Sequence, residues 1–249
     1  MKEYSLTLSL LICIVFLSCK QNGRYGAIPP ERASRFLYVR TETPWPGNLP
    51  EVKELITKNA NIEYIDSSKI TKSTPFLNAS GALECLKRKS TRRAGELDSM
   101  EVEAVKIVKY LASKGANIHA TSTSRKLNAL HLAACGGREK VIPVLVSLGL
   151  DINSRDSTKG FGVTALLHAI GAGDLATVKA IFSAGADINL CSLDGNSPLD
   201  WAMYYVRIKG KTFATPYNDQ ETIVEYMQSI GAKQGKNEFK GMLYFDESQ

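Results

Sequence analysis

The segment Asn128–Asn189 carries the same residue pattern twice, and this repetition constrains the fold more than any other feature. The first copy reads NALHLAACGGREKVIPVLVSLGLDIN and the second reads TALLHAIGAGDLATVKAIFSAGADIN. Small and apolar residues coincide when the copies are aligned: Leu130 with Leu166, Ala133 with Ala169, Gly137 with Gly173, Ile142 with Val178, and Gly149 with Gly185. Self-similarity at a period of about 33 residues is typical of stacked repeats.

Each copy predicts a pair of short helices. Leu130, Ala133 and Ala134 lie at i, i+3 and i+4, which gives the first helix one small apolar face. Gly137 ends that helix, and a second apolar run follows at Val141–Leu148. Two short helices cannot bury both of their apolar faces alone, so each pair must stack on a neighbouring pair.

The copies resemble the ankyrin repeat. The family's opening T-P-L-H-x-A is similar to Asn128–Ala133, and its closing G-A-D-[VI]-N is matched in full by Gly185–Asn189. The resemblance implies an all-α ankyrin solenoid of about four helix-turn-helix repeats with short β-hairpin fingers.

The isoleucine of the closing motif measures the spacing of the repeats. Ile62 to Ile118 is 56 residues, Ile118 to Ile152 is 34, and Ile152 to Ile188 is 36. We therefore expect long insertions in the first and last repeats, mainly at Gly81–Asp98 and at Lys209–Asn218. In the first repeat fragment, Asn59 takes the glycine position and can adopt the same left-handed conformation.

The N-terminal segment predicts export. Lys2 precedes an apolar run, Leu6–Leu17, that is too short to span a bilayer. The run ends in Phe16-Leu17-Ser18-Cys19, which resembles a bacterial lipoprotein signal with Cys19 as the acylated residue. The alternatives are an ordinary secretory signal and an uncleaved short anchor. The lipoprotein interpretation ties the chain to the bacterial cell envelope by lipid, on the periplasmic side or at the outer membrane.

Four parts follow from these observations. We expect a signal peptide with acylated cysteine at 1–19, a tether and N-terminal cap at 20–50, the ankyrin-repeat domain at 51–233, and a C-terminal tail at 234–249. Within the cap, Arg35–Arg40 is apolar enough to cover the end of a solenoid.

The residues that could support chemistry are sparse. None of the three histidines shares a helix face with another at metal-ligand spacing, and His131 takes the position of the family's structural histidine. No C-x-x-C, serine-nucleophile or phosphate-loop pattern is present. We therefore expect no enzymatic activity, no metal and no cofactor. We expect Cys135 to be a small buried apolar residue, and whether Cys85, Cys135 or Cys191 forms a disulfide stays open.

Charge gives little guidance about the partner. The formal charge of +6 is mild for 249 residues and does not imply nucleic acid, which export also makes an improbable target. The basic cluster Lys87–Arg93 is either a solvated loop or a contact with anionic lipid headgroups or an acidic protein.

The ankyrin resemblance also implies a binding surface, in which finger tips and the ends of the first helices form one concave face. Tyr204 and Tyr205 are expected either to anchor a partner there or to pack beneath the insertion Lys209–Asn218. The residues assigned to this face are Arg125, Lys126, Lys159, Phe161, Leu193, Asp194, Asn196, Tyr204 and Tyr205. The remaining helix-end positions hold Cys135, Gly136, Gly171 and Ala172.

The expected function is that of a monomeric, membrane-anchored interaction module that binds another exported protein. The first alternative is an inhibitor or immunity-type protein that blocks an exported enzyme. The second is an enzyme whose site the sequence patterns do not reveal. Fold class does not by itself distinguish among these functions.

Overall fold

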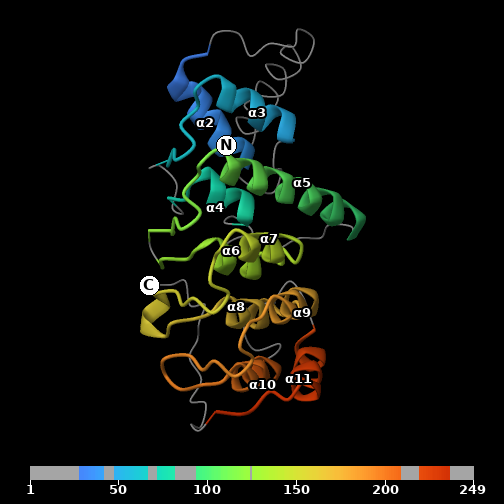
Figure 1. Cartoon of the computed structure of the whole chain (residues 1–249). Helices are drawn as coiled ribbons and strands as arrows, with labels where there is room; N and C mark the ends of the chain where they lie inside the picture. Colours follow the sequence, from blue (N-terminus) through green and yellow to red (C-terminus); the bar gives the residue numbers. More distant parts are fainter. Residues whose placement is uncertain are drawn as a thin grey trace, which may run out of the picture.

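The computed structural model describes residues 28–41, 48–66, 72–81, 94–123, 125–208 and 219–235, and over these ranges the chain is a stack of helix pairs (Figure 1). The helices are α2 (Pro30–Thr41), α3 (Leu49–Thr57), α4 (Pro75–Ser80), α5 (Ala94–Ser113), α6 (Ala129–Cys135), α7 (Val141–Ser147), α8 (Ala165–Ala172), α9 (Leu175–Ser183), α10 (Pro198–Ile208) and α11 (Gln220–Ser229), with a short 3₁₀ helix, η1 (Thr158–Gly160).

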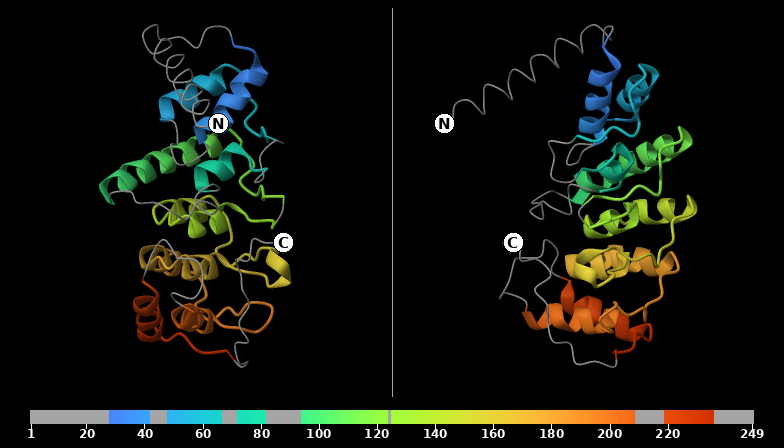
Figure 2. Two further views of the ribbon diagram at one scale, coloured as in Figure 1. Left: turned by 180° about the vertical axis from the view of Figure 1, so that it is seen from behind. Right: turned by 90° about the vertical axis from the view of Figure 1, so that its left-hand side faces the viewer.

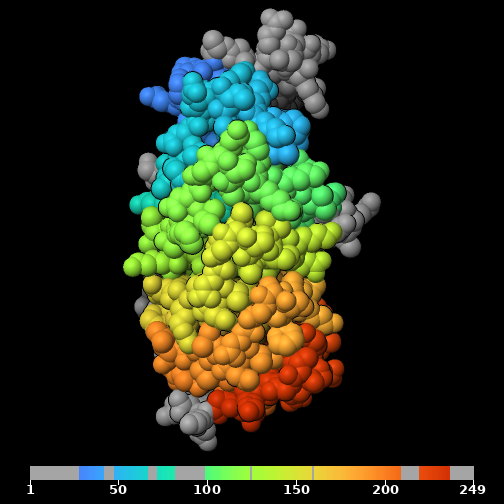
Figure 3. Space-filling model, viewed as in Figure 1, coloured from blue at the N-terminus to red at the C-terminus, as the bar shows by residue number. Residues whose placement is uncertain are grey.

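The pairs stack in two parallel rows of helices. The first helices form one row, in which α2, α4, α6, α8 and α10 contact one another in order, and the second helices α3, α5, α7, α9 and α11 form the other. Figure 2 shows these layers from two further sides, and in Figure 3 they form successive bands from blue to red. Each pair therefore contacts chiefly its neighbours, as the repeat pattern predicted.

Polar caps fix where the first helices begin. The side chain of Thr74 accepts a hydrogen bond from the Leu77 N–H (3.3 Å), and Pro75 occupies the first turn of α4. Asn128 Oδ1 accepts from the His131 N–H (3.0 Å) in the same way at α6. Thr164 repeats this cap at α8. The opening motif therefore starts a helix because its first side chain accepts a hydrogen bond from a backbone N–H group that would otherwise have no partner.

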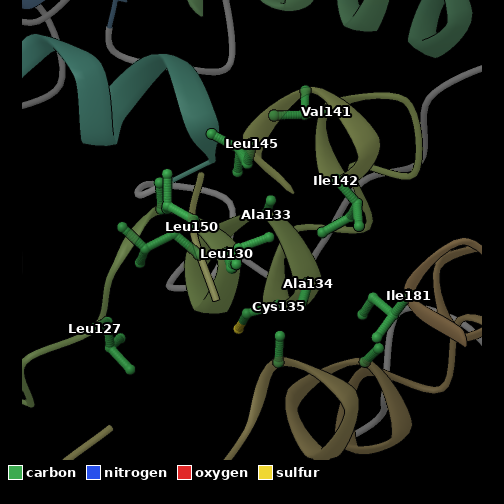
Figure 4. Close-up of a cluster of buried hydrophobic side chains, with 14 of the residues drawn as sticks. Leu127, Leu130, Ala133, Ala134, Cys135, Val141, Ile142, Leu145, Leu150 and Ile181 are labelled. Atoms are coloured by element: carbon green, nitrogen blue, oxygen red, sulfur yellow. The ribbon is translucent and has the colours of Figure 1, made fainter. Parts of the chain in front are cut away.

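The core contains both small and large apolar side chains, and Figure 4 shows one cluster of them around α6, α7 and α9. Leu130, Ala133 and Ala134 of α6 have no exposed surface, which confirms the apolar face predicted at i, i+3 and i+4. Leu145 of α7 and Ile181 of α9 are equally buried. The two alanines allow α6 to lie close to α8, so the small residues set the spacing of the stack.

Turn residues after the second helices close each pair. Gly115, Gly149 and Gly185 have φ of 85°, 99° and 96°, the left-handed conformation that ends a helix with little strain. Asn59 has φ of 61° after α3, which confirms that it replaces glycine there. A side-chain clamp then joins successive turns: Asn153 Oδ1 accepts from the Asp187 N–H (2.9 Å), and Asn189 Oδ1 accepts from the Lys233 N–H (2.8 Å).

The described residues form five helix pairs, where the sequence suggested about four repeats. The additional element is α2, which completes the first repeat fragment by pairing with α3, because Ala33, Leu37 and Tyr38 give α2 an apolar face that packs on α3 and α4. The segment Arg35–Arg40 thus lies within a complete helical layer rather than in an irregular cap. The excess in the next repeat partly lengthens α5, which has 20 residues.

The fingers contain no strands within the described ranges. The β-hairpins expected there are reduced to a single bridge between Arg155 and Thr164. Each finger is too short for a ladder, and η1 occupies the tip of the longest one. Within the same ranges, no helix combines the length and apolarity that a bilayer-spanning segment needs.

Several predictions concern residues outside the described ranges. These are the signal segment 1–19 with Cys19, the basic cluster Lys87–Arg93, the insertion Lys209–Asn218, and all of the tail beyond residue 235. They stay predictions.

Candidate protein-binding surface

Three finger loops project from one side of the stack, on the left in Figure 1. Each is closed by one backbone hydrogen bond across its base. The Ser122 N–H donates to the Leu127 carbonyl (2.9 Å), Asp156 donates to Val163 (3.0 Å), and Ser192 donates to Asn196 (2.9 Å). The loops therefore have the same closure although their lengths differ.

Backbone hydrogen bonds also join each finger to the next. The Ser157 N–H donates to the Arg125 carbonyl (2.9 Å), and the Leu193 N–H donates to the Phe161 carbonyl (2.7 Å). These bonds bring together residues that the sequence assigned to one face. We use "finger surface" for the partly or fully exposed residues along this edge: Arg125, Lys126, Phe161, Leu193 and Asp194.

Leu193 is the most exposed large apolar residue of the described chain, with 68% of its surface accessible. It lies against Gly162, where an added Cβ would be 2.8 Å from Leu193 Cγ. Half-buried Phe161 lies next to that glycine in the sequence and bonds to the Leu193 backbone. The finger surface thus includes an apolar part, in which Leu193 packs against Gly162 and is bonded through its backbone to Phe161.

Lys126 marks the polar end of the finger surface. Its φ is 51°, whereas Gly162 and Gly195 have φ of 60° and 85° at the equivalent positions of the next two fingers. A non-glycine residue in this conformation typically costs about 1 kcal/mol or more, and such strain concentrates at functional sites. The lysine therefore occupies a strained position where glycine would be easier to accommodate.

Arg155 is a residue of this surface that the sequence interpretation missed. Its Nη1 donates to the Gly162 carbonyl (2.9 Å), and its Nη2 donates to the Cys191 carbonyl (2.5 Å). It therefore fixes the second finger against the third. Its position just after the closing motif was visible in the sequence, but only the folded structure brings the two carbonyls within its reach.

Asp194 and Asn196 serve the finger turn. Asn196 Nδ2 donates to Asp194 Oδ2 (2.6 Å), and the Ser192 hydroxyl bonds to the other carboxylate oxygen. Asn196 is only 7% exposed, whereas Asp194 stays exposed. For Lys159 the structure describes only the backbone, within η1, so its role stays a prediction.

Tyr204 and Tyr205 lie mainly inside the stack. They are 8% and 9% exposed and form an aromatic cluster with Trp201 of the same helix. The Tyr205 hydroxyl lies 3.0 Å from the position that a Cβ on Gly171 would occupy. This burial favours packing over anchoring, but the insertion Lys209–Asn218 lies outside the described residues, so both roles considered for the pair stay predictions.

The helix-end positions are similarly closed. Gly171 and Ala172 are buried, Gly136 is half-buried, and Cys135 is 3% exposed and disulfide-bonded. The buried position of Cys135 was expected, whereas the sequence left open whether it forms a disulfide. The accessible part of the expected concave face is therefore the finger edge rather than the helix ends.

The histidines beneath the fingers maintain the fold. His131 Nδ1 accepts the Asn128 N–H (3.2 Å), and its Nε2 donates to the Ser154 carbonyl (3.0 Å). Burial, with a smaller contribution from the charge of His168, lowers the pKa of His131 to about 4. Both ring nitrogens are thus used in holding the finger base to α6.

His168 forms the second part of this buried network. Its Nε2 donates to Asp156 Oδ2 (3.0 Å), and Thr158 also bonds to that carboxylate. Burial alone would raise the pKa of Asp156, but these hydrogen bonds and the charge of His168 lower it to about 2. No group of histidine, cysteine and acidic side chains in the described ranges is arranged to hold a metal ion.

The fold and this surface define a helical-repeat protein whose accessible loops project from one side. Comparison with known proteins identifies the repeat. A family model for the ankyrin repeat matches residues 125–157, which cover the end of the first finger, α6 and α7. The chain therefore contains an ankyrin repeat.

Two curated proteins show the same kinship. An ankyrin repeat protein of fowlpox virus (strain NVSL) is 30% identical over 122 residues, which cover 49% of this chain and 35% of the viral protein. Ankyrin repeat domain-containing protein 37 of Xenopus tropicalis is 27% identical over 117 residues, covering 43% of this chain and 69% of that protein. The chain thus matches about a third of the viral protein. Ankyrin repeats indicate a protein–protein interaction module, and such modules are in general not enzymes.

Proposed function

We propose that this chain is a lipid-anchored interaction module of the bacterial cell envelope that binds another exported protein through its finger surface. The observation that carries the proposal is the hydrogen-bonded row of fingers, which presents exposed Leu193 on the third finger and the cations of Arg125 and Lys126 on the first. An exposed apolar centre with a charged rim is the arrangement that protein interfaces favour.

The disulfide at Cys135 supports the export part of the proposal. Disulfides persist in oxidising compartments such as the bacterial periplasm and are rare in the cytosol. The N-terminal pattern ending at Cys19 supports the lipid anchor, because an apolar run of this length followed directly by cysteine resembles a lipoprotein signal. Two or more acyl chains would hold the protein stably at a membrane.

Photo-cross-linking in cells tests the binding surface. A photoreactive phenylalanine replaces Leu193 in one variant and Val102 in the other, since Val102 of α5 is also an exposed apolar residue (40%) but lies outside the fingers. We expect one discrete protein adduct from position 193 and none from position 102. Equal adducts from both positions, or adducts from position 102 alone, would place the interface elsewhere.

The substitution Lys126→Gly tests the contribution of Lys126 to partner binding without lowering the stability of the fold. The change removes the cation but relieves the positive-φ conformation, so the folded chain should be at least as stable as the natural one. We expect the adduct at position 193 to form more slowly and with weaker salt dependence, because rim cations mainly accelerate association. Unchanged capture would exclude Lys126 from the interface. If the captured protein is an enzyme that loses activity in the complex, the module is an inhibitor.

A further inference from the structure

The first helix of the stack presents a second surface. The residues of α2 that pack on α3 and α4 are Ala33, Ser34, Leu37, Tyr38 and Thr41. The opposite side of the helix carries Arg32, Arg35, Phe36 and Val39, which we call the α2 outer face. At 100° per residue these four positions lie within one stripe, directly across the helix from the buried residues. The pair α2–α3 forms one end of the stack (Figures 1 and 2).

The chemistry of the α2 outer face combines two cations with apolar surface. Arg32 and Arg35 are exposed, and neither makes an ion pair or side-chain hydrogen bond within the described part of the chain. Arg40, by contrast, pairs with Glu51 of α3 (3.3 Å). Val39 is 45% exposed, and Phe36 is half-buried beside it. Guanidinium groups bind phosphate oxygens well, and apolar side chains between them enter the interfacial layer of a bilayer.

The position of this face in the chain points to a lipid surface. Cys19 precedes Pro30 by 11 residues, which span at most roughly 40 Å when fully extended. A lipid on Cys19 would therefore keep α2 close to the bilayer. Residues 20–40 contain five lysines and arginines and one acidic residue, Glu31, so their charge complements an anionic membrane.

We infer that the α2 outer face docks on anionic phospholipid headgroups, so that one end of the stack lies on the membrane. This inference rests on the proposed lipid anchor. The lipid would then be the first of two membrane contacts and the basic, apolar helix face the second. Docking at this end leaves the fingers of the later repeats, which project from the side of the stack, accessible to a protein partner.

Vesicle binding of the processed chain without its lipid tests the inference. The protein is residues 20–249, which retain every described contact because the described stack begins at residue 28. The probes are vesicles of phosphatidylcholine with and without phosphatidylglycerol. We expect binding only to vesicles that contain phosphatidylglycerol, and we expect added salt to reverse it. No binding to either vesicle would overturn the inference.

Paired substitutions locate the contact. Arg32→Gln with Arg35→Gln should weaken partition onto phosphatidylglycerol vesicles roughly 30-fold, since each basic residue near the surface contributes a factor of about five. Lys109→Gln with Lys233→Gln removes the same charge from exposed positions away from α2 and should change partition much less. Equal losses in the two variants would mean a diffuse charge effect and would overturn docking by α2.

Fractionation of cells separates this inference from the proposed function. Cys19→Ala in the full chain should release the processed protein from the membrane fraction or leave it unprocessed. If the natural chain is membrane-bound and Cys19→Ala is not, while the arginine variant binds vesicles normally, only docking by α2 is wrong. If Cys19→Ala changes neither processing nor membrane association, the anchor is wrong. Loss of the cross-linked protein in the arginine variant would show that the face binds protein and overturn lipid docking.

Discussion

At the scale of single residues, the buried histidines show how one side chain sets both a helix start and a loop. His131 satisfies the Asn128 N–H at the beginning of α6 and the Ser154 carbonyl at the base of the second finger. Only the neutral ring with its proton on Nε2 makes both bonds, because a protonated Nδ1 cannot accept. Burial lowers the pKa of His131 to about 4, so the ring is in this neutral form at neutral pH.

The contribution of His131 to stability should consequently fall in mild acid. The folded-state pKa of about 4 is below the unfolded value of 6.5, so the unfolded chain binds the proton first. The stabilisation by His131 is complete above pH 6.5 and decreases by about 3 kcal/mol toward pH 4. Urea unfolding of the natural chain and of His131→Gln at several pH values measures it. The stability difference between them should narrow as the pH falls, and parallel curves would contradict the assignment.

At the scale of elements, α10 shows that a helix with side chains suited to binding can instead contribute those side chains to the core. The sequence left Tyr204 and Tyr205 as either groove anchors or packing residues. In the structure α10 packs on α8 and places the Tyr205 hydroxyl against Gly171. The absent side chain at Gly171 makes the room that the tyrosine fills. Met203 of the same helix is 39% exposed and lies on the other side.

Truncating Tyr205 should therefore cost stability. Tyr205→Ala should lower the free energy of unfolding by about 3 kcal/mol or more, as expected for a buried aromatic residue. Met203→Ala changes the same helix at an exposed position and should cost less than about 1 kcal/mol. Denaturant unfolding measures both. If Tyr205→Ala stays as stable as Met203→Ala and instead loses the cross-linked partner, the tyrosine belongs to the interface.

At the scale of the whole molecule, a covalent link adds to the packing of neighbouring pairs. Cys135 is disulfide-bonded and Cys191 is a free thiol. Removal of residues 1–18 and acylation of Cys19, as proposed, would leave Cys85 as the only available partner. Cys85 lies outside the described residues, so this pairing is a prediction from the count of cysteines.

Mass mapping without reductant tests that pairing. We expect a linked peptide pair containing Cys85 and Cys135, and alkylation of Cys191 alone. The link closes a loop of roughly 50 residues, and in the chain-entropy model reduction should then cost about 4 kcal/mol. Cys191→Ser is the control and should leave the effect of reductant unchanged. Alkylation of Cys135 in the folded, unreduced protein would contradict the bond.

The sequence by itself determined the local structure. The caps Thr74, Asn128 and Thr164, the turn glycines and the small residues on the first helices were all recognisable because helix starts, left-handed turns and close packing depend on residues near in the chain. The repetition of that pattern then implied stacking, because one pair cannot bury its own apolar faces. Lys126 and Leu193 could be assigned to the fingers for the same reason.

Only the tertiary structure decided which of these residues are accessible. The burial of Tyr205 depends on the space at Gly171. The relative position of the second and third fingers depends on the hydrogen bond from Arg155 to the Cys191 carbonyl. The extra layer depends on the packing of α2 on α4. Each of these contacts joins residues from different repeats or layers. A local pattern specifies the shape of one unit, whereas exposure is a property of the surfaces left over after the units have packed together.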